Sequence, residues 1–139
     1  MAISLEDFKD IEFPLESDFS VVYIIYFRRD SKDIYFYVGE TSRYIGGRLG
    51  DYVRANFNAA TDFKVGEAIR YLRGLGLYVG VRYFATLNRK EVEASLENEL
   101  KSKGYKLLND LKGYRYEEST EKHERKRIHD FMSKLQLES

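Results

Sequence analysis

The alternation of apolar and polar positions predicts a β-hairpin near the start of the chain. Residues 21–27 are apolar, β-branched and aromatic, which is typical of a buried strand. Residues 34–38 form a second such run, and the charged stretch 28–33 between them predicts a loop of about six residues. Gly39 follows directly, so we expect the strand to end there in a close turn toward the next element.

Helical spacing of apolar residues predicts two helices after the hairpin. The first covers residues 42–56, where Arg48 and Tyr52 stand four positions apart and therefore share one helix face. Residues 57–62 are polar and small, as in a loop. Apolar positions then recur at helical intervals before Gly74, which we expect to cap the second helix.

The remainder of the chain predicts one more strand and two more helices. Residues 77–84 are apolar on both faces except for Arg82, as in a strand, and residues 89–103 carry the apolar stripe of a third helix that Gly104 ends. Residues 117–137 predict a C-terminal helix. The element order is thus β-β-α-α-β-α with an added helix. We therefore predict an α+β fold in which a small three-stranded antiparallel sheet is flanked by helices.

The length of 139 residues corresponds to a single domain. We expect its core at about residues 20–110, with an N-terminal arm at residues 1–19 and a C-terminal helical segment at residues 114–139. The arm is acidic and has apolar residues at near-helical spacing before Pro14, the only proline. We interpret it as a packing arm that covers the sheet.

Composition and charge narrow the classes of protein that fit. The sequence has no cysteine, which excludes disulfides and cysteine-ligated metals. We find no signal peptide and no apolar run long enough to span a bilayer, so we expect a cytoplasmic protein without a membrane partner. The net charge is zero, but residues 1–20 carry one base against six acids and residues 101–127 nine bases against five acids. This imbalance permits a polyanionic partner without requiring one.

Two tripeptides and a set of later polar residues resemble the GIY-YIG nuclease family. Val-Val-Tyr at residues 21–23 and Tyr-Val-Gly at residues 37–39 stand where the family has its two motifs. The family's later arginine, tyrosine or histidine, glutamate and asparagine are matched by Arg48, Tyr52, Glu97 and Asn109. Two departures are that Val21 replaces the first glycine and that the arginine lies one residue further from the second motif than in many members.

The resemblance implies a metal-dependent endonuclease that hydrolyses phosphodiester bonds of DNA, double-stranded or branched. Glu97 would be the only protein carboxylate in contact with a single Mg²⁺ or Mn²⁺ ion, with water and phosphate as the other ligands. Arg48 would bind the scissile phosphate through its planar guanidinium, which does not lose its charge. A small stand-alone endonuclease of restriction, phage or mobile-element type is the closest kind of relative that this resemblance indicates.

The tyrosines and the asparagine complete the site that the resemblance implies. Tyr23 would act as the general base, Tyr37 would orient the water, and Tyr52 would hydrogen-bond the phosphate or Tyr23. A tyrosine accepts a proton in this way only if its pKa, about 10 in water, is lowered or if a metal assists. Asn109 would brace the site, and Gly39 would allow a close turn between strand and helix.

Other interpretations of the same residues stay open. Glu93, Glu97 and Lys101 follow one another at i, i+4 intervals, as they do on a solvated helix face. Glu99 is the alternative metal ligand if the match to the family shifts along the helix. The chain also fits a nuclease scaffold that binds nucleic acid without cutting it. The sequence leaves DNA against RNA, and monomer against homodimer, undecided.

Overall fold

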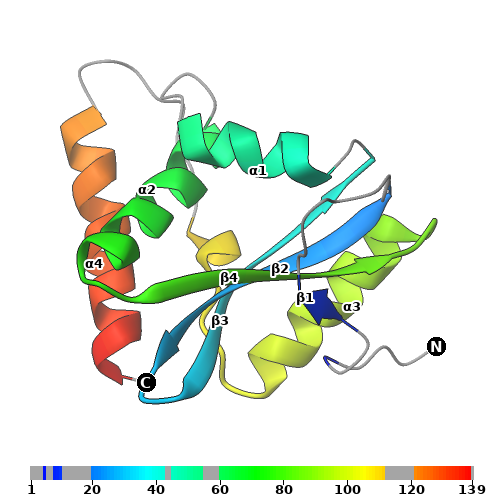
Figure 1. Ribbon diagram of the computed structural model, residues 1–139. Helices are drawn as coiled ribbons and strands as arrows, with labels where there is room; N and C mark the ends of the chain where they lie inside the picture. Colours follow the sequence, from blue (N-terminus) through cyan, green and yellow to red (C-terminus); the bar gives the residue numbers. More distant parts are fainter. Residues whose placement is uncertain are drawn as a thin grey trace.

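The computed structural model describes residues 5, 8–10, 20–42, 45–54, 60–111 and 121–138. The chain folds into one sheet with helices on both of its faces (Figure 1). The elements follow in the order β1 (Lys9–Asp10), β2 (Val21–Arg29), β3 (Lys32–Thr41), α1 (Ile45–Arg54), α2 (Ala60–Gly74), β4 (Tyr78–Ala85), α3 (Arg89–Ser102), the 3₁₀ turn η2 (Leu108–Asp110) and α4 (Glu121–Glu138).

The sheet is antiparallel and has the strand order β1-β4-β2-β3. Its three long strands confirm the predicted three-stranded antiparallel sheet, and the predicted order of strands and helices is also confirmed. The central strand β2 is buried over its first seven residues, which explains the continuous apolar run at residues 21–27. The addition is β1, whose two residues pair with Tyr83 and Arg82 at the edge of β4.

The hairpin between β2 and β3 is tighter than its charged sequence indicates. Both strands continue through the charged stretch, and only Asp30 and Ser31 remain as the turn, with φ of 50° and 65°. Positive φ at both central residues is the geometry of a type I′ turn. The predicted six-residue loop is wrong because Arg28 and Asp33 pair across the hairpin, with Nε donating to Oδ1 at 2.9 Å.

A β-bulge in β3 sets the direction of its side chains. Ile25 pairs with Tyr37 and Tyr26 with Tyr35, so that Phe36 is left without a partner residue in β2. Phe36 and Tyr37 consequently both face the larger of two hydrophobic cores. The bulge thereby places Tyr37 on the same face of the sheet as the β2 side chains that end in this core.

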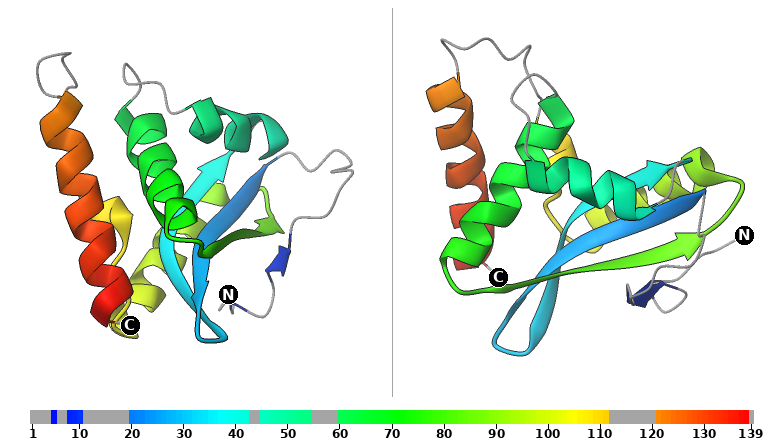
Figure 2. Two further views of the ribbon diagram at one scale, coloured as in Figure 1. Left: turned by 60° about the vertical axis from the view of Figure 1, so that its left-hand side comes forward. Right: turned by 45° about the horizontal axis from the view of Figure 1, so that its top comes forward.

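Each face of the sheet has its own hydrophobic core. Helices α1, α2 and α4 cover one face, and α2 and α4 lie side by side there (Figure 2). Helix α3 covers the other face through Val92, Leu96 and Leu100, which are the three positions of the predicted apolar stripe. Phe8 from the N-terminal arm completes this second core, with its ring centroid 5.8 Å from that of Phe84.

Several predicted boundaries move in the structure. Helix α2 begins at Ala60, inside the predicted loop, and its left-handed cap residue is Gly76 with φ of 81° rather than Gly74. The N–H of Leu77 donates to the carbonyl of Leu72 at 3.1 Å, so the cap lies two residues later than the sequence predicts. Gly104, with φ of 92°, follows α3 as predicted.

The structure describes the N-terminal arm only at residues 5 and 8–10. There Lys9 and Asp10 add a short strand at the edge of the sheet instead of lying across its face, while Phe8 packs in the second core. The near-helical spacing before Pro14, the first helix beyond Arg54 and the start of the C-terminal helix before Glu121 lie outside the described residues. Within the described part of the chain, none of the helices combines the length and apolar character needed to cross a membrane.

Candidate active site

Three tyrosines that the sequence analysis singled out meet beneath helix α1. Tyr23 comes from β2, Tyr37 from the bulged part of β3 and Tyr52 from α1, and all three are buried. Their ring centroids are 6.4 Å (Tyr23–Tyr37), 6.2 Å (Tyr23–Tyr52) and 6.1 Å (Tyr37–Tyr52) apart. The hydroxyls of Tyr23 and Tyr52 share a hydrogen bond. These contacts define the tyrosine cluster, formed by Tyr23, Tyr37 and Tyr52.

Gly39 makes room for the tyrosine cluster rather than forming a turn. It lies inside β3, directly opposite Tyr23 in the register, and β3 continues to Thr41. A Cβ at this position would overlap Cζ and Oη of Tyr23 and would lie only 2.7 Å from its Cε2. The expectation of a turn at Gly39 is therefore wrong, and the absence of a side chain serves close packing within the sheet.

Arg48 lies over the tyrosine cluster and is held in place by two aspartates. Its Cζ is 4.6 Å from the centroid of the Tyr52 ring, a cation–π contact between neighbours on one face of α1. Nη1 donates to Oδ1 of Asp62 at 2.6 Å and to Oδ2 of Asp51 at 3.4 Å. The side chain is 19% exposed, so the guanidinium is oriented in advance and still reaches solvent.

Burial dominates the electrostatics of the tyrosine cluster. It raises the pKa of Tyr23 well above the ordinary value, with a further rise from Tyr37, against the lowering effects of Tyr52 and Arg48. The pKa values of Tyr37 and Tyr52 are raised for the same first reason, and Arg48 again acts against the rise. The phenols are consequently protonated near neutral pH and serve as hydrogen-bonding groups.

Asn109 joins the edge of the sheet to helix α3. Its Oδ1 accepts a hydrogen bond from the N–H of Val38 at 2.9 Å, and its Nδ2 donates to the Val38 carbonyl at 2.6 Å. The side-chain amide thus satisfies the outward backbone groups of an edge strand as a further strand would. Nδ2 also lies 3.2 Å from Oε1 of Glu97. The predicted bracing role of Asn109 has a concrete geometry here: it connects Glu97 to the strand that carries Tyr37.

Glu97 is partly exposed and has charged neighbours of both signs. Burial raises its pKa, the charge of Lys101 lowers it, and that of Asp110 raises it again. Lys101 Nζ is 3.9 Å from Oε2 of Glu97 and is held more closely by Asp110, at 2.7 Å. Glu99, the alternative ligand, instead pairs with Lys103 at 3.0 Å. Of the two glutamates, Glu97 is the one that contacts Asn109.

Glu93 is a site residue that the sequence analysis did not select. It lies one turn before Glu97 on α3, and its pKa is raised to about 7, first by burial and then by the negative charges of Glu97 and Glu40. Its charge also contributes to the raised pKa of Tyr37. We call Glu93 and Glu97 the carboxylate pair. The i, i+4 spacing of Glu93 and Glu97 does not identify Glu93 as a site residue, because the same spacing is typical of a solvated helix face.

Lys64 is a second residue that sequence reasoning missed. It is buried on α2, where its Nζ donates to the carbonyl of Leu111 at 3.0 Å. Burial lowers its pKa, against the raising influence of Asp110 and Glu97. The charge of its ammonium therefore interacts with Asp110 and Glu97. Nothing in the sequence distinguishes Lys64 from a surface lysine. Its burial, which is rare for a lysine, is visible only in the structure.

The carboxylate pair fits a hard divalent cation with few protein ligands. Two neighbouring carboxylates whose mutual repulsion raises a pKa would be stabilised by positive charge between them. Mg²⁺ and Mn²⁺ prefer such oxygen donors and keep several waters. In the described ranges, no group of three or more His, Cys, Asp or Glu side chains is placed to hold a metal ion. An ion here would take most of its ligands from water and phosphate.

Comparison with known proteins adds no relative. The chain matches no protein-family model, no curated protein and no solved structure. The functional assignment therefore depends on the residues and geometry of the chain itself.

Proposed function

We propose that the protein is a metal-dependent endonuclease of the GIY-YIG type that hydrolyses phosphodiester bonds of DNA in the cytoplasm. The observation that carries the proposal is the convergence of residues distant in the sequence. Arg48 lies over the tyrosine cluster, and Asn109 connects the strand that carries Tyr37 to Glu97. Double-stranded or branched DNA is the proposed substrate, bound by a monomer or a homodimer.

The chain's own residues divide the tasks of the reaction. Arg48, held by Asp62 and Asp51, presents a guanidinium that stabilises charge on a phosphate bound over the cluster. In its phenolate form, Tyr23 would accept the proton that the attacking water loses, Tyr37 beside it would orient that water, and Tyr52 would hold Tyr23 through their shared hydrogen bond. A Mg²⁺ or Mn²⁺ ion held by Glu97, with Glu93 one turn away, would supply further stabilisation of the phosphate charge.

Proton acceptance by Tyr23 requires positive charge nearby, because burial raises the pKa of this phenol. Arg48 already acts to lower the pKa of all three tyrosines. Arg48 alone leaves the pKa of Tyr23 above its ordinary value, so the phenolate would form only with further positive charge nearby, such as that of a bound divalent cation.

The second candidate function is DNA binding without cleavage. It is favoured by the engagement of Arg48 with Asp62 and Asp51, which a phosphate would have to displace. The raised pKa values of the three tyrosines also favour binding without cleavage, because a protonated phenol does not accept a proton from water. The two functions differ in one observable, the metal-dependent breakage of a DNA strand.

Plasmid cleavage with matched glutamate variants tests the proposal. We expect the protein to nick or linearise supercoiled plasmid in Mg²⁺ and to leave it intact in EDTA. Glu97→Gln should abolish cleavage while retaining DNA binding, because the charge that holds the cation is lost and the shape is kept. Glu99→Gln is the control and should cut at the wild-type rate, since Glu99 pairs with Lys103 away from Asn109. Equal cutting by both variants, or none by the wild type, would contradict the proposal.

A further inference from the structure

A basic cavity lies along the outer edge of β3, away from the candidate active site. It has a volume of about 370 Å³ and is lined by residues from β3, the segment after α3, and α4. The seven lining residues include three lysines, of which Lys103 is paired with Glu99 at 3.0 Å; they are Lys32, Ile34, Lys103, Gly104, Tyr105, Lys106 and Leu135. Cavities of a few hundred Å³ are of the size that small ligands occupy.

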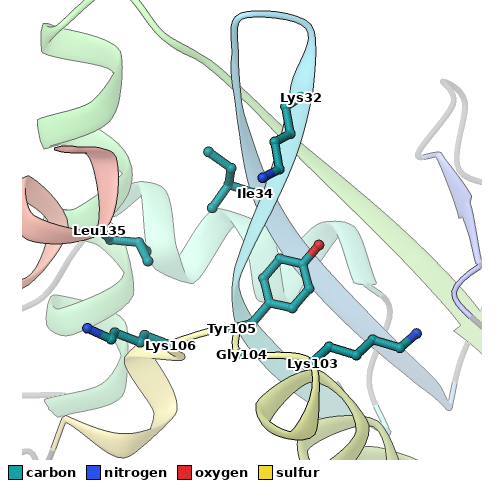
Figure 3. A pocket seen from close by; sticks show the side chains of 7 residues that line it. All are labelled: Lys32, Ile34, Lys103, Gly104, Tyr105, Lys106 and Leu135. Atoms are coloured by element: carbon teal, nitrogen blue, oxygen red, sulfur yellow. The ribbon is translucent and has the colours of Figure 1, made fainter. Parts of the chain in front are cut away.

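The cavity combines positive charge with an accessible aromatic ring. Lys32 and the hydroxyl end of Tyr105 point toward one another across it, while Lys103 and Lys106 extend to opposite sides (Figure 3). The Tyr105 ring is fixed from behind by Tyr35, with their centroids 5.5 Å apart and their planes at 62°. Ile34 and Leu135 supply apolar walls. A rigid ring beside ammonium groups is the combination that binds a base and its phosphate.

The cavity shares an edge of the sheet with the candidate active site. Ile34 precedes Val38, the residue bound by Asn109, by four positions, which is about 13 Å along a strand. Lys103 follows Glu97 by six positions, about 9 Å along α3 if the helix is extended to it. Both separations fall within the span of a few nucleotides of one nucleic-acid strand.

We propose that this cavity is a nucleotide subsite, in which Lys32 binds a phosphate and Tyr105 stacks on the base of a strand that crosses the carboxylate pair. The inference rests on the proposed function for the identity of the strand. It assigns the cavity a positioning role, because its residues lie too far along β3 to touch the scissile phosphate. The subsite holds an unpaired nucleotide, since only an unstacked base can enter the cavity and meet the ring.

Anisotropy titrations with a short fluorescein-labelled single-stranded DNA in EDTA test the subsite without cleavage. Tyr105→Leu should weaken binding about tenfold, because stacking is lost, whereas Tyr105→Phe keeps the ring and should bind like the wild type. Lys32→Gln should reduce the slope of log K against log salt by about 0.7, the value for one phosphate on a single strand. Lys122→Gln, an exposed lysine on α4, is the control and should change neither.

Each outcome decides one part of the proposal. Wild-type binding by both Tyr105→Leu and Lys32→Gln would overturn the subsite. A loss with Lys32→Gln alone would identify a general anion site and would overturn the base-stacking assignment. Thermal melts of Tyr105→Leu separate lost stacking from lost packing against Tyr35, and the exposed Lys32 gives a variant without that concern. Plasmid cleavage that persists while the variants bind normally would reject the subsite and keep the nuclease. If the wild type does not cut plasmid but its binding of DNA depends on Tyr105, the subsite stands and the nuclease proposal is rejected.

Discussion

The two halves of the candidate site differ in how they handle charge. The tyrosine cluster is buried, uncharged and packed against a glycine that leaves no spare room. Glu93 and Glu97 are partly exposed; Glu97 interacts with Lys64, Lys101 and Asp110, and Glu93 with Glu40 and Lys90. The tyrosine half is rigid and its phenols stay protonated near neutral pH, while the carboxylate half contains Glu93, whose pKa is raised to about 7. Strand β3 and Asn109 connect them.

This difference indicates which half sets the geometry and which responds to conditions. Buried phenols with raised pKa values do not change charge between pH 4 and 9, so they provide a constant hydrogen-bonding frame. Glu93, whose pKa is raised to about 7, changes its charge with pH near neutrality. Arg48 is the cation that contacts the tyrosine cluster, and its replacement should have the largest effect on function.

Arg48→Ala should lower the rate of plasmid cleavage by about 10²–10³, because a preorganised donor to the phosphate is removed. Arg54→Ala is the matched control on the same helix. Arg54 also contacts Asp51 but is 70% exposed and is not in contact with Tyr52, so the rate should stay at the wild-type level. The measurement is single-turnover cleavage in Mg²⁺. Equal rates for the two variants would remove Arg48 from the reaction and leave the tyrosine cluster without a functional cation.

Gly39→Ala tests whether the tyrosine cluster is as tightly packed as the geometry indicates. The added methyl group would overlap the Tyr23 ring, and overpacking of this kind costs about 1–3 kcal/mol of unfolding free energy. Gly50→Ala is the control in α1, where the nearest atom to a new Cβ is 3.8 Å away, and it should stabilise by up to about 1 kcal/mol. Urea unfolding of both variants gives the comparison. A wild-type midpoint for Gly39→Ala would mean that Tyr23 moves freely and that the rigid half is not rigid.

The sequence predicted the elements better than it predicted the contacts between them. The apolar run at residues 21–27 predicted β2 correctly because a buried strand needs apolar side chains on both faces, and the run at residues 77–84 predicted β4, although most of that strand is only partly buried. The ends were missed where charged residues pair across strands, as Arg28 and Asp33 do. Gly39 was misinterpreted because a glycine that opens a turn and one that admits a ring look the same in sequence.

The site was predicted to the extent that the resemblance supplied positions. It gave Tyr23, Arg48 and Glu97, which lie on β2, α1 and α3 of the described fold. Glu93 and Lys64 could not be found in this way, because their burial depends on how α3 and α2 pack against the edge of the sheet. Helical spacing identifies a face but does not say what the face meets.

The smallest expected effect concerns the responsive half and separates it most clearly from the rigid one. The pKa of Glu93 is raised in the fold from its ordinary value of 4.5 to about 7, so the folded chain binds a proton more tightly than the unfolded chain. The associated stability is fully present below about pH 4.5 and is lost as the pH rises through about 7. Glu93→Gln keeps a neutral side chain at every pH. Above pH 7 it should therefore unfold with a free energy about 1 kcal/mol higher than the wild type, once solvent screening of this half-buried group is allowed for. Below pH 4.5 the two proteins should be equally stable.

Glu91→Gln, exposed two residues earlier, and Tyr23→Phe, in the rigid half, should both retain the wild-type dependence on pH. Urea titrations at intervals across this range measure the slopes. If Glu93→Gln loses stability with rising pH as the wild type does, Glu93 is not the group that couples stability to pH. If Tyr23→Phe flattens the curve of stability against pH, the rigid half titrates in this range.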